Sequence, residues 1–252
     1  SSDLGGWNTA ASNFQLWHNG HQVPVYTSTT GVLGSAGYIE FWGEANDGRV
    51  DVGLFRKPED QLNTALSFEG DSATYFLTVN SNTAQNLRYS AAVNDVAGKA
   101  GGLTVEPYFY YTTQKELGTT LNRGPATPYG SDYVYMSDYR GKSFGAIVKG
   151  GASKSVSFTN LFAYPGVSGT VRAGVSGSSP LGNNNRVVTV TGSDGSSVNG
   201  KLGNFASQLY VLGSAQVTSR YTVTVKNGAA NTNDQINASF VSLRYHRVFN
   251  FG

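Results

Sequence analysis

The stretch "RYTVTVKNG", Arg220 to Gly228, shows the pattern that decides the fold. Apolar and polar side chains alternate along it, as in a strand with one face in a core and the other in solvent, before Asn-Gly ends it. Similar stretches recur from Lys149 onward, about ten residues apart, with Gly or Asn between them. They are "SVSFTNLFAYP", "GTVRAGVSG", "NRVVTVTGSDG", "SQLYVLGS" and "INASFVSLRYHRVFNFG". This regularity predicts a β-sandwich or jelly roll.

The N-terminal part of the chain predicts further β-structure, built from hairpins. "NFQLWHNGHQVPVYT" contains two short strands joined by Asn19-Gly20, a dipeptide typical of type I′ hairpin turns. "YIEFWG" and "RVDVGLF" flank residues 46–48, Asn-Asp-Gly, and predict a second hairpin. Glu40 and Asp51 alternate with apolar residues in these two stretches, so we expect them on the solvent face of that hairpin.

The segments that follow suggest where the chain divides. "SATYFLTVN", residues 72–80, predicts another strand, and residues 58–65 are the best candidate for a short helix. "NDVAGKAGG", residues 94–102, is typical of a linker or long loop. We therefore expect an all-β chain with at most one or two short helices. Its two β-domains would be an N-terminal domain of residues 1–104 and a β-sandwich, jelly-roll-like domain of residues 105–252.

The composition narrows the classes of function. The net charge is only +2 and Lys and Arg form no cluster, which argues against a nucleic-acid partner. No apolar run approaches the roughly 18 residues that a membrane span needs. The chain has no cysteine, so disulfides, thiolate metal sites and a Cys nucleophile are excluded within these residues. It starts at Ser1 without Met or a signal peptide, which is typical of a processed product.

Four of the 16 acidic residues lie within residues 37–55. They could include a catalytic pair of carboxylates, or they could form the solvent-exposed face of a hairpin. Glu40 and Asp51 would need carboxyl groups about 5–9 Å apart to serve as acid and base of a glycosidase. Their alternation with apolar residues favours a solvated strand face instead. Glu44, Asn46 and Asp51 offer oxygen atoms for calcium, but without the full alternating acid pattern of a calcium loop. We expect no catalytic residue and no cofactor, with calcium as the weaker alternative.

Aromatic residues give the strongest functional signal in the composition, at 12% of the chain. Alternating aromatic side chains fill β-cores and interfaces, and exposed ones also form platforms on which sugars stack. Both interpretations stay open for this chain. The residues singled out as possible ligand or interface aromatics are Trp17, Trp42, Tyr108, Tyr110, Tyr133 and Tyr135.

Several stretches in order resemble a known family. "FQLWHNGHQVPVYTSTTG", "GYIEFWGEANDGRVDVGLF", "ALSFEGDSATYFLTVN" and, at the end, "LRYHRVFNFG" look like the region ahead of the catalytic domain in gingipain-like cysteine peptidases of Bacteroidota. The same region occurs in the sortase of the type IX secretion system. Two departures concern the second half: "DYRGKSFG" lacks an expected "GEGW"-like sequence, and His246 stands where Pro is usual. The family's catalytic Cys and His lie in a later domain, so the resemblance implies no catalytic role for this chain.

The resemblance implies an exported protein at the bacterial cell surface, in the outer membrane or outside the cell. The chain would be a non-catalytic accessory or pro-domain that packs on the downstream catalytic domain and meets the secretion machinery. Arg123, in "LNRGPATPYG", would then be a candidate pseudo-substrate of a peptidase that prefers Arg. The aromatic residues support an alternative, a carbohydrate-binding or adhesive cell-surface β-module with glycans as partners. The sequence leaves both hypotheses open.

Overall fold

The computed structural model describes residues 8–55, 57–67, 70–93, 98, 104–121, 126–129, 132–135, 144–178 and 186–250. Contacts along the chain group it into two compact units. Unit 1 consists of Ser1–Asp47 and Glu69–Leu103, and unit 2 of Gly48–Phe68 and Thr104–Gly252. Strands dominate both units, which confirms the all-β prediction, and the helical segments are short 3₁₀ turns. Within the described ranges, no helix is long and apolar enough to cross a membrane.

Unit 1 contains a three-stranded antiparallel sheet in the order β2-β1-β5. β1 (Phe14–His18) and β2 (His21–Val23) form the predicted hairpin, with His18 opposite His21. Asn19 and Gly20 both have positive φ, 47° and 76°, as a type I′ turn requires. β5 (Phe76–Val79) lies within the predicted strand of residues 72–80 and pairs with the other edge of β1. The local sequence was therefore a sound guide here.

The second predicted hairpin is wrong. β4 covers only Ile39–Glu40 and pairs with β3 (Tyr26–Thr27), whereas Gly48–Leu54 forms the 3₁₀ helix η2. The expected hairpin turn at residues 46–48 does not form, because its backbone N–H groups bond to distant segments. The Asn46 N–H donates to the carbonyl of Asp71, and the Gly48 N–H donates to the carbonyl of Thr64. Non-local hydrogen bonds therefore override the local Asn-Asp-Gly signal.

Two features of η2 explain this outcome. A Cβ at Gly48 would collide with the carbonyl oxygen of Leu66, so the backbones approach each other at a point where only glycine fits. Asp51, expected in solvent, is buried and accepts a hydrogen bond from the Ser67 hydroxyl at 3.3 Å. Glu40, by contrast, is exposed as predicted.

Three more 3₁₀ turns complete the described helical structure. η3 (Pro58–Asp60) replaces the helix predicted over residues 58–65 and begins, as expected, at a proline. η1 (Ala11–Asn13) leads into β1, and η4 (Thr83–Gln85) follows β5. These turns add little regular structure, so the strands and their connections define both units.

Unit 2 contains a β-sandwich. One sheet has six strands in the path β15-β12-β17-β10-β7, with β6 also paired to β17. Its strands are β6 (Phe109–Glu116), β7 (Thr120–Leu121), β10 (Phe144–Lys149), β12 (Gly169–Gly177), β15 (Ser207–Ala215) and β17 (Gln235–Arg247). The other sheet has the order β11-β16-β13-β14, formed by β11 (Ser153–Thr159), β13 (Arg186–Gly192), β14 (Ser197–Leu202) and β16 (Arg220–Asn227). A separate pair joins β8 (Ala126–Tyr129) to β9 (Asp132–Tyr135).

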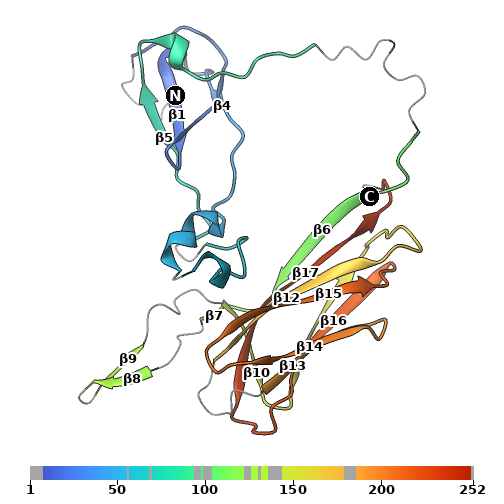
Figure 1. Cartoon of the computed structure of the whole chain (residues 1–252). Helices are drawn as coiled ribbons and strands as arrows, with labels where there is room; N and C mark the ends of the chain where they lie inside the picture. The colour runs from blue at the N-terminus through green and yellow to red at the C-terminus, as the bar shows by residue number, and fades with distance from the viewer. Residues whose placement is uncertain are drawn as a thin grey trace. The chain divides into compact units, whose positions relative to one another are not determined.

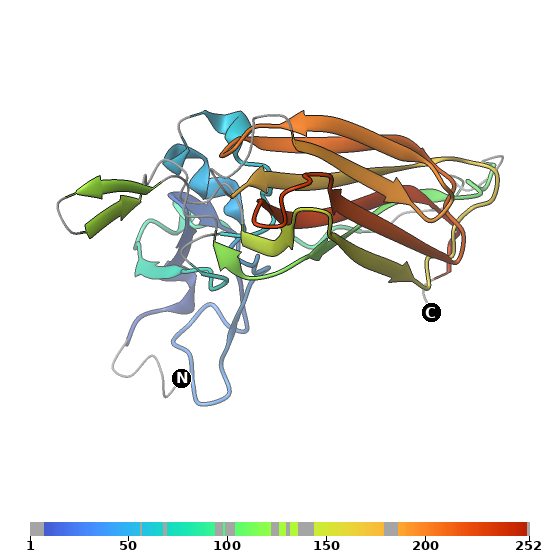
Figure 2. The same cartoon turned by 90° about the horizontal axis from the view of Figure 1, so that it is seen from below.

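The long strand β17 organises the larger sheet. It pairs with β12 along one side, and with β10 and then β6 along the other. Figure 1 shows it in red, with β6 and β12 on either side of its upper part. Figure 2 shows the two sheets of the sandwich as two layers. Strands that are far apart in the sequence of unit 2, such as β6 and β17, thus lie side by side in one sheet.

The core of the sandwich is continuous and apolar. Alternate residues of the strands point inward, so that in "RYTVTV" the buried side chains are Tyr221, Val223 and Val225. The facing sheet contributes Leu243 and Tyr245, among others, to the same cluster. This arrangement confirms the alternation on which the sandwich prediction rested.

Candidate functional site

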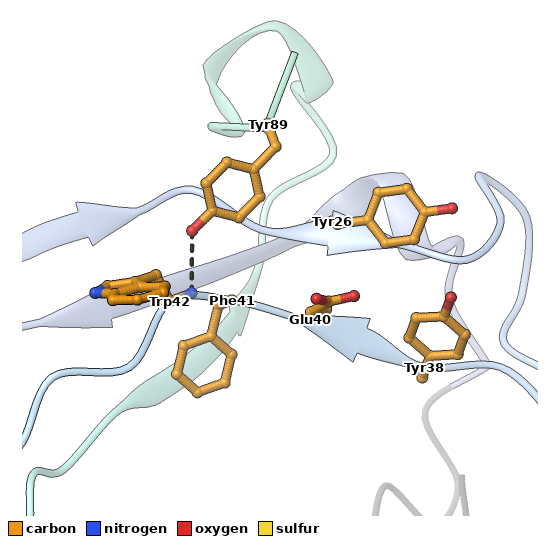
Figure 3. Close-up of a pocket in the computed structure, with 6 residues that line it drawn as sticks. All are labelled: Tyr26, Tyr38, Glu40, Phe41, Trp42 and Tyr89. Carbon is orange, nitrogen blue, oxygen red and sulfur yellow. Dashed lines mark hydrogen bonds between the residues drawn. The ribbon is translucent and has the colours of Figure 1, made fainter. Parts of the chain in front are cut away.

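The clearest candidate site of unit 1 lies at the short strand pair β3–β4. Tyr26 stands directly opposite Glu40 in the register. Because side chains alternate along extended backbone, Tyr38, Glu40 and Trp42 share one side. Figure 3 shows these four side chains together with Phe41 and Tyr89.

These six residues line an open hollow of about 640 Å³, which we call the aromatic hollow. Its volume lies within the roughly 300–1,000 Å³ typical of small-molecule sites. Trp42 is 77% exposed, so most of its indole surface is in contact with solvent. Glu40 is the one charged side chain among the lining residues that the structure describes. The hollow therefore presents five rings and a single carboxylate to an incoming partner.

Backbone hydrogen bonds hold the rings in place. The Trp42 N–H donates to the Tyr89 hydroxyl at 3.0 Å, drawn dashed in Figure 3. The Tyr89 N–H in turn donates to the carbonyl of Val25 at 3.3 Å. The Tyr38 N–H donates to the Ser28 hydroxyl at 3.0 Å, which fixes the start of β4. The lining is thus tied to the neighbouring strands rather than left on a free loop.

A second layer of rings supports Phe41. The ring of Tyr75 packs against Phe41 with centroids 4.9 Å apart, and His18 stacks on Tyr75 at 4.4 Å. The Tyr75 hydroxyl accepts a hydrogen bond from the Glu44 N–H at 2.8 Å. His18 also lies 2.9 Å, through Nδ1, from the carbonyl oxygen of Thr74. This network links β1 to the segment after β4 and stabilises the shape of the hollow.

The predicted aromatic residues fall into three groups. Trp42 lines the aromatic hollow, whereas Trp17 is half-buried in β1 and lies outside it. Tyr108 and Tyr110 lie in unit 2, where their rings contact each other with centroids 6.3 Å apart. The side chains of Tyr133 and Tyr135, and Arg123 with its neighbours at 122–125, lie outside the described residues.

The calcium candidates Glu44, Asn46 and Asp51 belong to no cluster of three or more acidic or histidine side chains among the described residues. Asn46 uses its side-chain amide to donate to the carbonyl of Gly70 at 2.8 Å. Asp51 is buried in the part of the chain that groups with unit 2, whereas Glu44 is exposed in unit 1. Nowhere in the described ranges do three or more His, Asp or Glu residues gather as a metal site. The structure therefore gives the calcium hypothesis no support.

The chemistry of the aromatic hollow is that of binding. Exposed ring faces attract the apolar faces of sugars or apolar protein side chains, and Glu40 can accept hydrogen bonds from hydroxyl groups. A hydrolase of the two-carboxylate type needs a second acid near the first. The lining supplies only Glu40. We therefore treat the hollow as a candidate recognition surface.

Sequence reasoning found part of this hollow and missed the rest. The alternation in "YIEFW" places Tyr38, Glu40 and Trp42 on one side, a signal that is readable without a structure. Tyr26 and Tyr89 could not be found in this way, because they come from separate segments that only the folded chain brings to β4.

No protein-family model matches the chain, and no curated protein is significantly similar to its sequence. Among solved structures, dimeric latent PorU from Porphyromonas gingivalis is similar with a TM-score of 0.48 and 9% identity, over 98% of this chain and 22% of the PorU chain. This chain thus spans about a fifth of that protein's length. The CBM36-1 domain of a multidomain xylanase from the hindgut metagenome of Trinervitermes trinervoides has a TM-score of 0.34 and 11% identity, over 53% of this chain and 96% of that domain.

A CBM36 carbohydrate-binding module in complex with calcium and xylotriose is similar at a TM-score of 0.32 and 12% identity, over 52% of this chain and 98% of the module. At these TM-scores, none of the similarities carries an argument about what this chain binds. The function must therefore be argued from the chain's own surface.

Proposed function

We propose that the chain is a non-catalytic β-module of an exported protein, and that unit 1 packs on another folded domain through its exposed aromatic surface. Following the resemblance in sequence, that domain is the downstream catalytic domain of a gingipain-like cysteine peptidase or sortase-like surface protein. The observation that carries the proposal is an imbalance in unit 1. Its described residues leave more large apolar side chains exposed than buried.

The imbalance is large. Among the described residues of unit 1, the buried apolar side chains are Ala11, Phe14, Leu16 and Val25, whereas the exposed ones are Tyr26, Val32, Tyr38, Phe41, Trp42, Phe76, Val79, Leu87, Tyr89 and Val93. Fully burying one large apolar side chain contributes about 1.5–3 kcal/mol, while ordering each residue's backbone costs about 1–2 kcal/mol. Four buried apolar side chains are few for a unit of this length. A partner that covers the exposed ones would therefore stabilise unit 1 substantially.

The charge of unit 1 indicates what the partner surface looks like. Seven acidic and two basic residues give unit 1 a net charge of −5, whereas nine acidic and sixteen basic residues give unit 2 a net charge of +7. Glu40 lies within the aromatic hollow and Glu44 close to it in sequence. Interfaces commonly combine an apolar centre with a rim of complementary charge. We expect the partner's surface that contacts unit 1 to be apolar at its centre and basic at its rim.

The first experiment is to sequence the encoding gene beyond Gly252 and produce the chain with and without the domain encoded there. Acrylamide quenching of tryptophan fluorescence then reports whether Trp42 is covered. We expect strong quenching in the chain alone and clear protection in the longer protein. A Trp42→Phe variant is the matched control, because it should abolish most of this difference while Trp7 and Trp17 remain. A stop codon soon after Gly252, or equal quenching in both proteins, would contradict the proposal.

A second candidate function, glycan binding, is favoured by one specific observation. Five rings and a carboxylate line one open hollow of ligand size, and Trp42 is the most exposed of the five rings. Such a surface suits a sugar, because ring faces stack on its apolar face and Glu40 accepts bonds from its hydroxyls.

Affinity electrophoresis across a panel of neutral polysaccharides tests this candidate. Retardation should be lost in Trp42→Ala and kept in Phe76→Ala, because Phe76 is an exposed ring of the same unit that lies outside the hollow. Circular dichroism should show that both variants are folded. No retardation on any polysaccharide, or equal loss in both variants, would remove glycan binding at this hollow.

A further inference from the structure

A second hollow lies in unit 2, on the outer face of the larger sheet. In the register, Arg244 of β17 stands between Thr170 of β12 and Thr112 of β6, and His246 stands opposite Tyr110. Leu243 is fully buried and belongs to the core, so Arg244 points to the other side of the sheet. Three strands that are far apart in sequence thus contribute to one spot.

The hollow has a volume of about 290 Å³ and is lined by Tyr110, Thr170, Arg244, Tyr245 and His246; we call it the arginine hollow. This volume is near the lower end of the range for ligand sites, which suits a single small group. Its side chains offer a guanidinium, hydroxyls and an imidazole. Unlike that of the aromatic hollow, its described lining includes no carboxylate.

Arg244 is held in place but keeps its hydrogen-bonding capacity. Its guanidinium lies over the ring of Tyr110, 4.7 Å from the centroid. The ring of Tyr110 is itself braced by His246, with centroids 4.5 Å apart, and His246 packs edge-on against Tyr108 at 4.6 Å. Within the described part of the chain, the guanidinium of Arg244 has no ion pair and no hydrogen bond. Stacking leaves its N–H edge able to donate two parallel bonds to a carboxylate.

The surrounding charge favours an anion. Unit 2 carries a net charge of +7, and Arg172 is exposed on the same face of β12, two residues from Thr170. The acidic residue of β6 on that face is Glu116, which already accepts hydrogen bonds from Asn63 and Gln114. Among the described residues, no acidic side chain lines the hollow to neutralise Arg244.

We propose that the arginine hollow binds a hexuronic acid residue of an acidic polysaccharide. The sugar carboxylate takes the two N–H groups of Arg244, and the hydroxyls of Thr170 and Tyr110 bond to the ring hydroxyls of the sugar. The backbone of β17 and β12 at this point is paired within the sheet, so recognition uses side chains alone. That favours a saccharide over a peptide carboxyl terminus, which is usually held by free backbone N–H groups.

The test is an NMR titration of the isotope-labelled full chain with methyl β-D-glucuronide. Methyl β-D-glucoside is the matched neutral ligand, because it differs only in carrying CH₂OH in place of the carboxylate. We expect the glucuronide to shift signals of Tyr110, Thr170 and His246, and the glucoside to bind at least about tenfold more weakly, because it lacks the charge-assisted bonds. Equal shifts with both sugars, or none with the glucuronide, would overturn the proposal.

Variants of Arg244 show whether binding needs the two parallel N–H groups of the guanidinium, here called the fork, or only a positive charge. Arg244→Gln should weaken glucuronide binding about tenfold or more, and Arg244→Lys should weaken it too, because lysine keeps the charge but loses the fork. Arg220→Gln is the control, since it removes an exposed arginine from the other sheet and should leave binding unchanged. Equal losses in Arg244→Gln and Arg220→Gln would mean that only net charge attracts the ligand, which contradicts the proposed site.

Two further arms identify the source of the carboxylate. An acetylated tripeptide with a free carboxyl terminus should bind more weakly than the glucuronide, and equal or tighter binding would overturn the choice of a sugar. Trp42→Ala should leave glucuronide binding unchanged, because Trp42 lies in unit 1. A failure of the arginine hollow can thus be told apart from a failure of the function proposed for unit 1.

Discussion

The two units differ in what holds them together. Unit 2 is organised around one apolar cluster that both sheets of the sandwich share, with side chains such as Val171, Val188 and Leu243 fully buried. Unit 1 buries few apolar side chains and exposes many. We therefore expect unit 2 to fold on its own apolar core, and unit 1 to depend on other means of stabilisation.

Polar links to the backbone supply part of that stabilisation. The guanidinium of Arg88 donates to the carbonyls of Ser12 at 2.7 Å and Phe14 at 2.9 Å, which ties the segment after η4 to the start of β1. Burial lowers the pKa of Arg88. The amide of Asn86 also donates to the carbonyl of Ser12, at 2.8 Å. Each such bond adds only about 0.5–1.5 kcal/mol, or about 1.5–3 from a charged donor, so they do not replace a large core.

The variant with the largest expected effect, Asp234→Ala, tests whether the sandwich unfolds independently of unit 1. Arg186 and Asp234 form a buried ion pair of 2.9 Å, in which burial lowers the pKa of Arg186 while Asp234 opposes that shift. Asp234→Ala leaves a buried guanidinium without its counter-charge and should lower the free energy of unfolding of unit 2 by about 3–5 kcal/mol. Urea unfolding followed by far-ultraviolet circular dichroism measures this loss.

Tryptophan fluorescence provides the control for Asp234→Ala. All three tryptophans, Trp7, Trp17 and Trp42, belong to unit 1, so their emission reports on that unit. We expect the fluorescence transition to stay in place while the transition by circular dichroism moves to lower urea. Equal movement of both transitions would show that the units unfold together and would break the comparison.

The next effect compares matched core leucines. Leu16 in unit 1 and Leu243 in unit 2 are both buried, and replacing either with alanine should cost about 2–5 kcal/mol. In Leu243→Ala the sandwich should remain folded in water with a lower urea midpoint. In Leu16→Ala the small core of unit 1 should fail, so that tryptophan emission is already that of an unfolded chain without urea. Native emission from Leu16→Ala would mean that unit 1 has stabilisation that its apolar core does not account for.

The smallest effect concerns Asp194, in the turn before β14. Its carboxylate accepts hydrogen bonds from the Gln216 N–H at 2.6 Å, the Tyr221 hydroxyl at 2.8 Å and Ser196. Burial acts to raise the pKa of Asp194, but these hydrogen bonds outweigh it and lower the pKa from 3.8 to about 2. A lowered pKa means that the carboxylate stabilises the folded state above about pH 4, and that this contribution disappears as the pH falls from 4 to 2.

Asp194 is exposed, so solvent screening limits the contribution to about 1 kcal/mol. Unfolding by urea at pH 7 and pH 2.5 measures it in the wild-type chain and in Asp194→Asn. The wild type should be more stable than the variant by about 1 kcal/mol at pH 7, with little difference at pH 2.5. A difference that grows on acidification would refute the assignment.

The comparison of the units also explains where sequence reasoning succeeded. In the sandwich, the alternation of "RYTVTV" and its companions predicted strands and buried faces correctly, because period-two alternation is local and a continuous core enforces it. The Asn19-Gly20 hairpin was equally local. Residues 46–54 failed because Gly48 and Asp51 take partners from residues 64–67.

The candidate sites were harder to predict than the strands. Trp42 and Tyr110 were both singled out as aromatic candidates, yet only the structure shows that they belong to two different hollows. Nothing in the sequence around Arg244 or Thr170 indicates a site. Their meeting depends on the pairing of β12 with β17.

The amino-acid pattern alone was enough to predict an all-β chain with a sandwich in its second half, and the composition excludes cysteine chemistry within these residues. Alternation determines which side chains share a face of a strand. It does not determine which strands become neighbours, because pairing depends on contacts between segments far apart in the chain. Tertiary structure therefore decided that Tyr110 lies opposite His246, that Asp51 is buried, and that unit 1 keeps its aromatic rings at the surface.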